Sequence, residues 1–391
     1  MPKTRVLIVD DSIVMRRIIS EAIACDTIEV VGTAANGRIA LQKVEQLHPD
    51  VVTLDVEMPD MDGMEVLARL RTSHPSLRVI MFSSLTEKSA EITLKALSAG
   101  AIDYDTKPTN TFGATDAVRA VRDSLLPKLS ALATSSAVKG MGIPASSLQP
   151  ARVPVAGPSL AALQRDHESI GTSQKRISTA PKARRSVDLV AIGASTGGPN
   201  ALADVFRDLP RLSVPIVISQ HMPPMFTRML AERLNSFSAC EVREAVDGDV
   251  LKPGLALIAP GDFHLLLRRD GVHVVVALGR GLPENSVRPS VDPMLRSAVD
   301  VFGGGILSVI LTGMGQDGLR GCEVVHGAGG QIVAQDEASS VVWGMPGFVV
   351  RAGLADVVVP LGQVAFEIDR RVQRPKTAEG AVPGPPEPFT P

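Results

Sequence analysis

The stretch LVAIGASTGGPNAL, residues 189–202, joins an apolar run to a glycine-rich segment around one serine. The run LVAIG predicts a short buried strand, and the residues from Pro199 onward predict a helix. A buried strand, a tight turn and a helix together form the repeating unit of a parallel α/β sheet. The stretch therefore predicts an α/β fold and raises the question of what Ser195 does in the turn.

The same alternation extends along most of the chain. In the first block the predicted strands are RVLIV, EVVGTA, VVTLD, RVIMFS and AIDYD, with helical patterns at 13–24, 37–47, 63–71, 87–99 and 112–133. In the second block they are LVAIG, PIVIS, GILSVILT and QIVAQ, with helical patterns near 199–208, 225–235, 293–302 and 318–327. Short apolar strands between helices indicate two doubly wound parallel sheets, the first flavodoxin-like and the second Rossmann-like.

One segment of the second block does not follow this alternation of strands and helices. HLLLRRDGVHVVVAL, residues 264–278, places Asp270-Gly271 between two β-rich runs, which predicts a tight antiparallel hairpin. We therefore expect a hairpin added to the second domain.

Length and local composition divide the chain of 391 residues. From about residue 134 the sequence is rich in Ser, Pro, Gly and Ala and then basic, without the periodicity of a buried face. We predict a first domain at 1–133, a flexible linker at 134–186, a second domain at 187–370 and a disordered tail at 371–391.

Charge and apolar patterning exclude several classes of protein. The formal net charge is −2, so nucleic acid is not an expected partner. No signal peptide pattern and no apolar run long enough to span a membrane is visible, which predicts a cytoplasmic protein without direct membrane insertion. Cys25, Cys240 and Cys322 match neither a metal spacing nor a disulfide framework, as expected in a reducing compartment.

Charged residues follow three strands of the first block. Asp10 and Asp11 follow the first strand, Asp55 closes the third, and Lys107 follows the fifth. Carboxylates that meet at one sheet edge repel each other unless a cation lies among them, and oxygen ligands suit Mg²⁺. With Mg²⁺ bound, Asp55 becomes a nucleophile toward a phosphoryl group. A strand-end aspartate taken alone is equally a helix cap.

The whole set, with DVEMPDMDG at 55–63 and Lys107-Pro108, resembles the receiver domain of bacterial response regulators. The resemblance implies that Asp55 is phosphorylated and that Asp11 and Asp55 bind Mg²⁺ with the backbone carbonyl of Glu57, supported by Asp10. It further assigns three switch positions: the hydroxyl to Ser83, the aromatic to Tyr104 and the lysine to Lys107.

Several explanations compete for Ser195. A phosphate loop needs a Lys after its last glycine, but Gly198 is followed by Pro199-Asn200, and the glycines do not fit the G-x-G-x-x-G dinucleotide pattern. Gly193 to Gly197 does fit G-x-S-x-G, the strand-to-helix turn that exposes a nucleophile. A serine that caps the following helix is the remaining alternative.

A nucleophile needs a base and an acid. His221 follows the next apolar strand, so it emerges at the same sheet edge as Ser195, and Asp317 lies in the glycine-rich loop after another buried strand. A single histidine at a strand end is more often structural than catalytic, and Asp317 by itself fits a helix N-cap or an Asp-Gly turn. Together the three residues predict a Ser-His-Asp triad. Their chain order differs from that of α/β-hydrolases.

Five motifs, GASTGGP, QHMP, RPSVDP, LTGMGQDG and AQDEASSVVWGMP, resemble the chemotaxis response-regulator protein-glutamate methylesterases. The family's triad falls on Ser195, His221 and Asp317. The resemblance implies hydrolysis of glutamate methyl esters on chemoreceptors, deamidation of selected glutamines, and control by a chemotaxis histidine kinase, with no cofactor for the ester hydrolysis. We expect backbone N–H groups of Thr196 and Met314 to form the oxyanion hole.

The sequence departs from the family at two positions, and two other functions compete with ester hydrolysis. Met225 stands where the family usually has glycine, and Trp343 where it usually has tyrosine. One rival is a phosphorylation-controlled binding module without catalysis, which the complete triad disfavours. Another is a transcription factor, but the second block pairs no recognition helix with a basic face.

Overall fold

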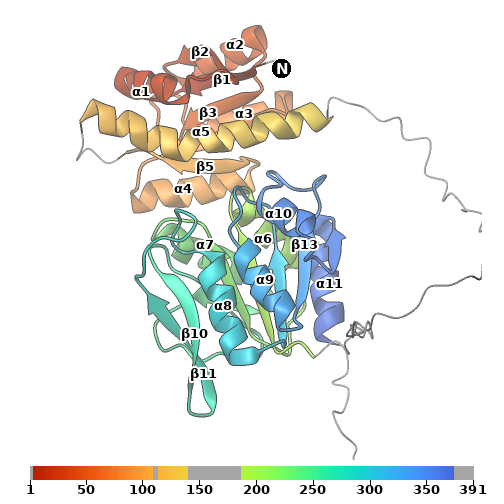
Figure 1. The fold of residues 1–391 in the computed structure, drawn as a ribbon. Coiled ribbons are helices and arrows are strands. Elements are labelled where there is room, and N and C mark those ends of the chain that lie inside the picture. The colour runs from red at the N-terminus through yellow and green to blue at the C-terminus, as the bar shows by residue number, and fades with distance from the viewer. Residues whose placement is uncertain (1–2, 109–112, 140–185, 374–391) are drawn as a thin grey trace, which may run out of the picture.

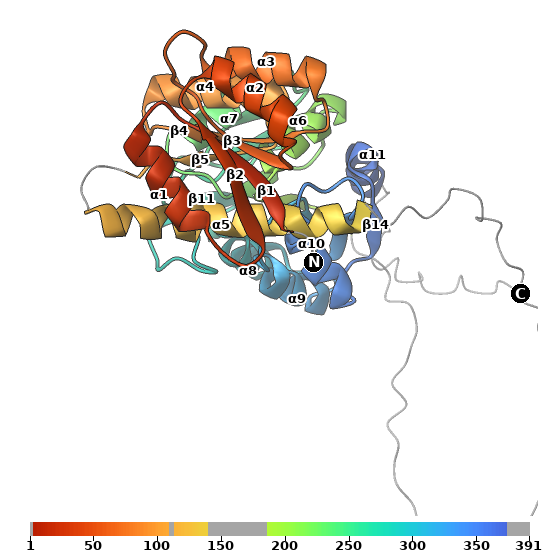
Figure 2. The same cartoon turned by 90° about the horizontal axis from the view of Figure 1, so that it is seen from above.

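The computed structural model describes residues 3–108, 113–139 and 186–373. These residues form two α/β domains, one stacked on the other (Figure 1). Viewed along the stacking direction, the N-terminal domain covers much of the C-terminal domain (Figure 2). Each domain holds a parallel sheet flanked by helices, and the C-terminal domain carries a separate hairpin, so the predicted fold class is confirmed.

The N-terminal sheet has five parallel strands in the order β2-β1-β3-β4-β5, which is the flavodoxin-like order. Its strands are β1 (Thr4–Val9), β2 (Ile28–Ala34), β3 (Val51–Asp55), β4 (Arg78–Ser83) and β5 (Asp103–Thr106). Its helices are α1 (Ile13–Ile23), α2 (Gly37–Leu47), α3 (Gly63–Ser73), α4 (Glu87–Ser98) and α5 (Ala114–Lys139). Every residue of β3 is buried, as the continuous apolar run VVTL requires of a strand covered on both faces.

The C-terminal sheet has seven parallel strands in the order β14-β13-β12-β6-β7-β9-β8. Its strands are β6 (Leu189–Ala194), β7 (Ile216–Gln220), β8 (Glu241–Glu244), β9 (Leu255–Ile258), β12 (Ile306–Ile310), β13 (Gln331–Gln335) and β14 (Val357–Val359). Its helices are α6 (Gly198–Asp208), α7 (Phe226–Asn235), α8 (Val291–Phe302), α9 (Leu319–Gly327), α10 (Met345–Arg351) and α11 (Leu361–Val372). Four of these strands were predicted. β8, β9 and β14 were not, because runs of three or four residues carry too little periodicity.

The strand order of the C-terminal sheet reverses at one point, between β6 and β12. In the C-terminal sheet the chain runs outward from β6 through β7 on one side and from β12 through β13 on the other. Ligand sites of open α/β sheets form at such reversal points, beyond the carboxyl ends of the strands. The loops that carry Ser195 and Asp317 leave β6 and β12, the two strands that flank this point.

The hairpin differs from its prediction by one position. β10 (His264–Asp270) pairs antiparallel with β11 (His273–Gly279), and Asp270 lies opposite His273. The turn is therefore Gly271-Val272, not Asp270-Gly271. Gly271 has φ 58°, the left-handed conformation that a tight hairpin turn requires and that glycine adopts most easily.

Two predicted boundaries are crossed by helices. α5 continues past residue 133 to Lys139, into the predicted linker, because no glycine or proline interrupts the chain between Lys128 and Lys139. α11 ends at Val372, inside the predicted tail, because Ile368 and Val372 pack into the core. The rest of the predicted linker, 140–185, and of the predicted tail, 374–391, lies outside the described residues.

The two domains meet through α4 and the edge strand β5 on one side and through α6 and α7 on the other. α4 of the N-terminal domain packs against α7 and α6 of the C-terminal domain. The rings of Tyr104 and Phe226 stack across the boundary with centroids 4.7 Å apart and planes 7° apart. Arg228 Nη2 lies 2.6 Å from Glu87 Oε1, and Asn200 Nδ2 donates to the carbonyl oxygen of Ala101. Within the described residues, no helix is long and apolar enough to cross a membrane.

Candidate active site and phosphorylation site

The main chain at Ser195 is held by the two strands beside β6. Ser195 N donates to the Thr312 carbonyl oxygen at 3.0 Å, and Gln220 Nε2 donates to the Ser195 carbonyl oxygen at 3.0 Å. Gly197, with φ 78°, is the N-cap of α6, and no side chain caps this helix. The helix-cap explanation of Ser195 is therefore wrong, and its hydroxyl is left for another role.

His221 emerges beside Ser195, as the parallel strand order predicts. Its backbone N donates to the carbonyl oxygen of Ala194, the residue before Ser195. Its Nε2 lies 2.7 Å from Asp317 Oδ2. Because Nε2 is engaged with the carboxylate, Nδ1 is the ring nitrogen that remains to exchange a proton.

Asp317 is a buried carboxylate with an unusually complete set of donors. Its Oδ2 accepts from His221 and from Val291 N, and its Oδ1 accepts from the Ser290 hydroxyl, the Asn285 amide, and the backbone N of Asp292 and Gly318. Burial alone would raise the pKa of Asp317, but the bonds from His221 and the other donors outweigh it and lower the pKa to about 2. The carboxylate is thus charged at neutral pH.

Three residues of this network were missed from the sequence. Asn285, Ser290 and Asp292 all bond to Asp317. The motif RPSVDP, residues 288–293, contains two of them and was the available signal. The motif resembles the family, but no strand end or spacing pattern in the sequence places it beside Asp317.

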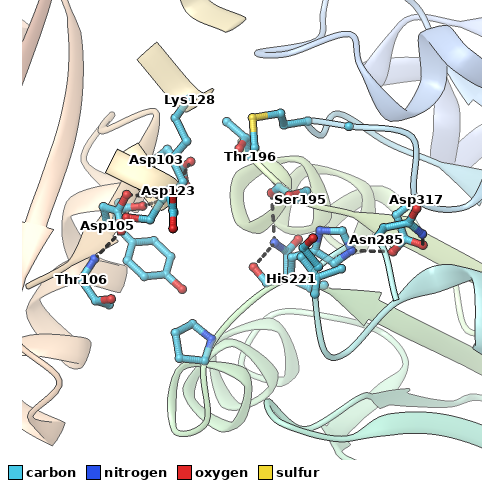
Figure 3. Close-up of a pocket in the computed structure, with 18 of the residues that line it drawn as sticks. Asp103, Asp105, Thr106, Asp123, Lys128, Ser195, Thr196, His221, Asn285 and Asp317 are labelled. Carbon is cyan, nitrogen blue, oxygen red and sulfur yellow. Dashed lines mark hydrogen bonds and ion pairs between the residues drawn. The ribbon is translucent and has the colours of Figure 1, made fainter. Parts of the chain in front are cut away.

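A cleft of about 610 Å³ lies over these residues, between the two domains. One wall carries Ser195, Thr196, His221 and Met314, so both residues expected to supply oxyanion-hole N–H groups line it. The opposite wall carries Asp103, Tyr104, Asp105 and Lys128 of the N-terminal domain. Figure 3 shows Ser195 and His221 on one side of the cleft and Asp103, Asp105 and Lys128 on the other. The predicted reacting groups therefore lie at the junction of the domains.

In the N-terminal domain, the structure gathers the predicted acidic residues. Carboxylate oxygens of Asp10, Asp11 and Asp55 lie within 4.8 Å of one another, and no other such group occurs in the part of the chain described. Lys107 Nζ lies 2.7 Å from Asp55 Oδ2 and 3.0 Å from Asp10 Oδ2. Burial raises the pKa of Asp55 to about 6, against the opposing effect of Lys107. Clustered hard oxygen donors of which two are buried fit a divalent cation such as Mg²⁺. The contribution of the Glu57 carbonyl remains a prediction.

The predicted switch residues lie on neighbouring strands. Ser83, at the end of β4, is buried and donates to the carbonyl oxygens of Ser84 and Ser89. Tyr104 on β5 is buried in the stack with Phe226. Tyr104 lies on β5, which pairs with the strand that carries Ser83, and its ring contacts Phe226, the first residue of α7 in the other domain.

Comparison with known proteins covers both domains. The sequence model of the response regulator receiver domain matches residues 6–119, and that of the CheB methylesterase family matches residues 190–368. A protein-glutamate methylesterase/protein-glutamine glutaminase of Trichodesmium erythraeum is 46% identical over 374 residues, covering 95% of this chain and 100% of the relative. One with the same name from Nocardioides is 45% identical, covering 96% and 97%.

Among solved structures, the CheB methylesterase catalytic domain of Thermotoga maritima is 44% identical, with a TM-score of 0.46, and covers 47% of this chain and 98% of its own. The response regulator domain of Thermotoga maritima CheB is 43% identical, with a TM-score of 0.30, and covers 33% and 94%. The full-length relatives decide the assignment, because their similarity extends over both domains. The chain, a receiver domain followed by a methylesterase domain, therefore belongs to the family of protein-glutamate methylesterases/protein-glutamine glutaminases.

Proposed function

We propose that this protein hydrolyses glutamate methyl esters on chemoreceptors, releasing methanol, and converts selected receptor glutamines to glutamate. Ser195, His221 and Asp317 form the catalytic triad of this proposal. The observation that carries it is the 2.7 Å contact between His221 and Asp317 beside Ser195, at the reversal point of the sheet. The enzyme works in the cytoplasm, where receptor helices and a chemotaxis histidine kinase are its partners.

The reaction follows from which atoms remain free. Ser195 Oγ attacks the ester carbonyl carbon while His221 Nδ1 accepts the hydroxyl proton, and Asp317 stabilises the imidazolium through Nε2. N–H groups of Thr196 and Met314 stabilise the oxyanion, a role worth roughly 3 kcal/mol per donor. The proton then passes to the leaving methoxide, and water releases the acyl group from Ser195 as glutamate. With a glutamine, ammonia leaves instead of methanol, and no cofactor enters either reaction.

Control in this proposal comes from phosphorylation of Asp55 by the kinase. Lys107 neutralises charge on the phosphoryl oxygens. Asp10, Asp11, Asp55 and the Glu57 carbonyl are the groups that would hold Mg²⁺, and the ion would offset the crowded negative charge. In this proposal the receiver is the N-terminal domain, which extends to the end of α5 at Lys139, and the methylesterase domain runs from about residue 187 to the end of α11 at Val372.

The closed arrangement of the domains supports a mechanism for this control. An α-helix with its side chains is about 10–12 Å across. A cleft of about 610 Å³ between the domains admits a side chain, but not a receptor helix laid across Ser195. Phosphorylation of Asp55 therefore acts by shifting the population toward molecules in which the receiver has moved off the cleft.

A methanol-release assay on methylated receptor membranes, with and without a small-molecule phosphodonor, tests substrate, catalysis and control together. We expect Ser195→Ala to abolish release without lowering the melting temperature. Asp55→Asn keeps the basal rate and loses the stimulation. Release by purified Ser195→Ala would refute the triad, and equal stimulation of Asp55→Asn would refute the control mechanism.

A further inference from the structure

Asn285 occupies a strained position at the rim of the cleft. It lies between β11 and α8 in the left-handed conformation, with φ 54°, and the following Ser286 has φ 65°. Few residues other than glycine adopt this conformation at low cost, and asparagine is the main exception. Both residues line the cleft in front of Ser195. The backbone thus turns sharply at the point where the amide reaches the site.

The two hydrogens of the Asn285 amide go to two different carboxylates. Nδ2 lies 2.9 Å from Asp317 Oδ1 and 2.9 Å from Asp292 Oδ2. Figure 3 shows Asn285 next to Asp317 at the rim of the site. The remaining oxygen of Asp292, Oδ1, accepts from Gly321 N at 2.7 Å. One side-chain amide therefore bridges the predicted triad acid and a second buried acid.

The second acid makes this bridge electrostatically important. Asp292 and Asp317 are 1% and 2% exposed, so neither charge is screened by water. Burial, together with the neighbouring charge of Asp317, raises the pKa of Asp292 to about 6, while the donors of Asp317 keep its pKa near 2. Other titratable groups that interact with this pair are His221, Glu284, Arg296 and Cys322.

We infer that Asn285 is a positioning residue for the hydrolysis: its amide holds Asp317 in the orientation that receives His221 Nε2 and separates it from Asp292. This inference rests on the triad of the proposed function. Without the bridge, Asp317 loses a donor that fixes its orientation and faces the Asp292 carboxylate directly, so it rotates away from Asp292. This rotation weakens its bond to His221, and the imidazolium formed during attack loses stabilisation.

Three variants test the inference. Asn285→Gly keeps the left-handed backbone and removes the amide. Asn285→Asp keeps the shape but replaces the donor with a carboxylate. The double variant Asn285→Asp/Asp292→Asn restores the total charge and the bond between positions 285 and 292, because an amide at 292 can donate to a carboxylate at 285. It still leaves Asp317 facing a carboxylate.

We expect Asn285→Gly to lower kcat about 10- to 100-fold, as for loss of a hydrogen bond to a charged group, with a change in KM below about 3-fold. Asn285→Asp loses more, and its activity falls off at a higher pH on the acid side, because the new carboxylate raises the pKa of Asp317. The double variant recovers part of the melting temperature that Asn285→Asp loses, through the bond between positions 285 and 292, but not the wild-type kcat.

Four results would overturn the inference: wild-type kcat in Asn285→Gly, a change confined to KM, an unmoved acid limb in Asn285→Asp, or recovery of kcat in the double variant. The last would show that the amide serves only to join the loop to Asp292. Ser195→Ala and Asp317→Asn, measured alongside, separate the two proposals. If both are inactive while the Asn285 variants match the wild type, the triad stands and only the role of Asn285 fails.

Discussion

Two buried aspartates of this chain have pKa values that move in opposite directions, and the number of donors around each explains the difference. Asp317 accepts six hydrogen bonds and has a pKa of about 2. Asp55 accepts from Lys107 Nζ and from Glu57 N, and burial raises its pKa to about 6. Asp317 is thus kept charged by the fold, as a triad acid must be, whereas Asp55 is crowded with like charge in the absence of a cation.

The raised pKa of Asp55 predicts a pH-dependent stability. An unfolded aspartate has a pKa of about 3.9, so between about pH 4 and pH 6 the folded state holds the proton more tightly. The free energy of unfolding therefore falls as pH rises through this range. We expect Asp55→Asn to remove this loss and to gain up to about 3 kcal/mol over the wild type at neutral pH. Calorimetry in a chelator, at several pH values, measures the difference.

Magnesium provides the control for this experiment. Since a cation bound to the folded state stabilises it by mass action, Mg²⁺ is expected to raise the melting temperature of the wild type more than that of Asp55→Asn. A difference between the two proteins that does not change with pH, or equal responses to Mg²⁺, would contradict the assignment of Asp55 to a crowded metal site.

The turn between β6 and α6 depends on one glycine. Gly197 has φ 78°, and a Cβ there would lie 2.6 Å from Val341 Cγ2. An alanine at this position combines left-handed strain with a steric clash, and relief of that clash displaces the adjacent Ser195. We expect Gly197→Ala to lower both the melting temperature and the rate of ester hydrolysis.

Gly248 offers a matched control for Gly197. It has φ 84°, but a Cβ there would meet nothing within 4 Å. Gly248→Ala therefore carries only the conformational cost, about 1–2 kcal/mol, and should keep its activity. If the two variants lose equal stability and both remain active, the clash with Val341 does not hold the turn in place.

Across the whole molecule, an apolar contact and a charged pair join the two domains. The Tyr104–Phe226 stack lies in the buried part of the interface, and the Arg228–Glu87 pair lies at its exposed edge. An exposed ion pair contributes about 0–1 kcal/mol. The Arg228–Glu87 pair is therefore well suited to testing the interface. Removing so weak an interaction shifts the balance between closed and open molecules without unfolding either domain.

Reversal of the charge at Arg228 is expected to open the interface. Arg228→Glu places two carboxylates together at Glu87, so the basal rate of methanol release should rise about 2- to 5-fold, the change that roughly 0.5–1 kcal/mol produces. The exchange Glu87→Arg/Arg228→Glu restores the attraction and should return the basal rate to the wild-type value. An unchanged rate in the single variant, or no return in the double variant, would argue against a closed inhibited form.

Much of the fold could be predicted because its signals are local. The predicted strands VVTLD and QIVAQ match β3 and β13 to the residue, since a strand covered on both faces has an apolar centre that is visible in the sequence. The edge strand β8, EVRE, was missed because a polar strand of four residues looks like a loop. Ser195, His221 and Asp317 were placed near one another because each follows a strand of a parallel sheet, whose carboxyl ends share an edge.

Patterns that act over a few residues therefore account for the two α/β domains and for the candidate triad. They do not place Asn285 or Asp292 beside Asp317, because these residues lie outside the strand ends and reach Asp317 only through the packing of α8 and the loop before it. Nor do they place the receiver over Ser195. Tyr104 and Phe226, which stack between the domains, cannot be told in the sequence from aromatic residues buried inside one domain. Contacts between residues far apart in the chain arise only when the strand order and the docking of the domains bring them together.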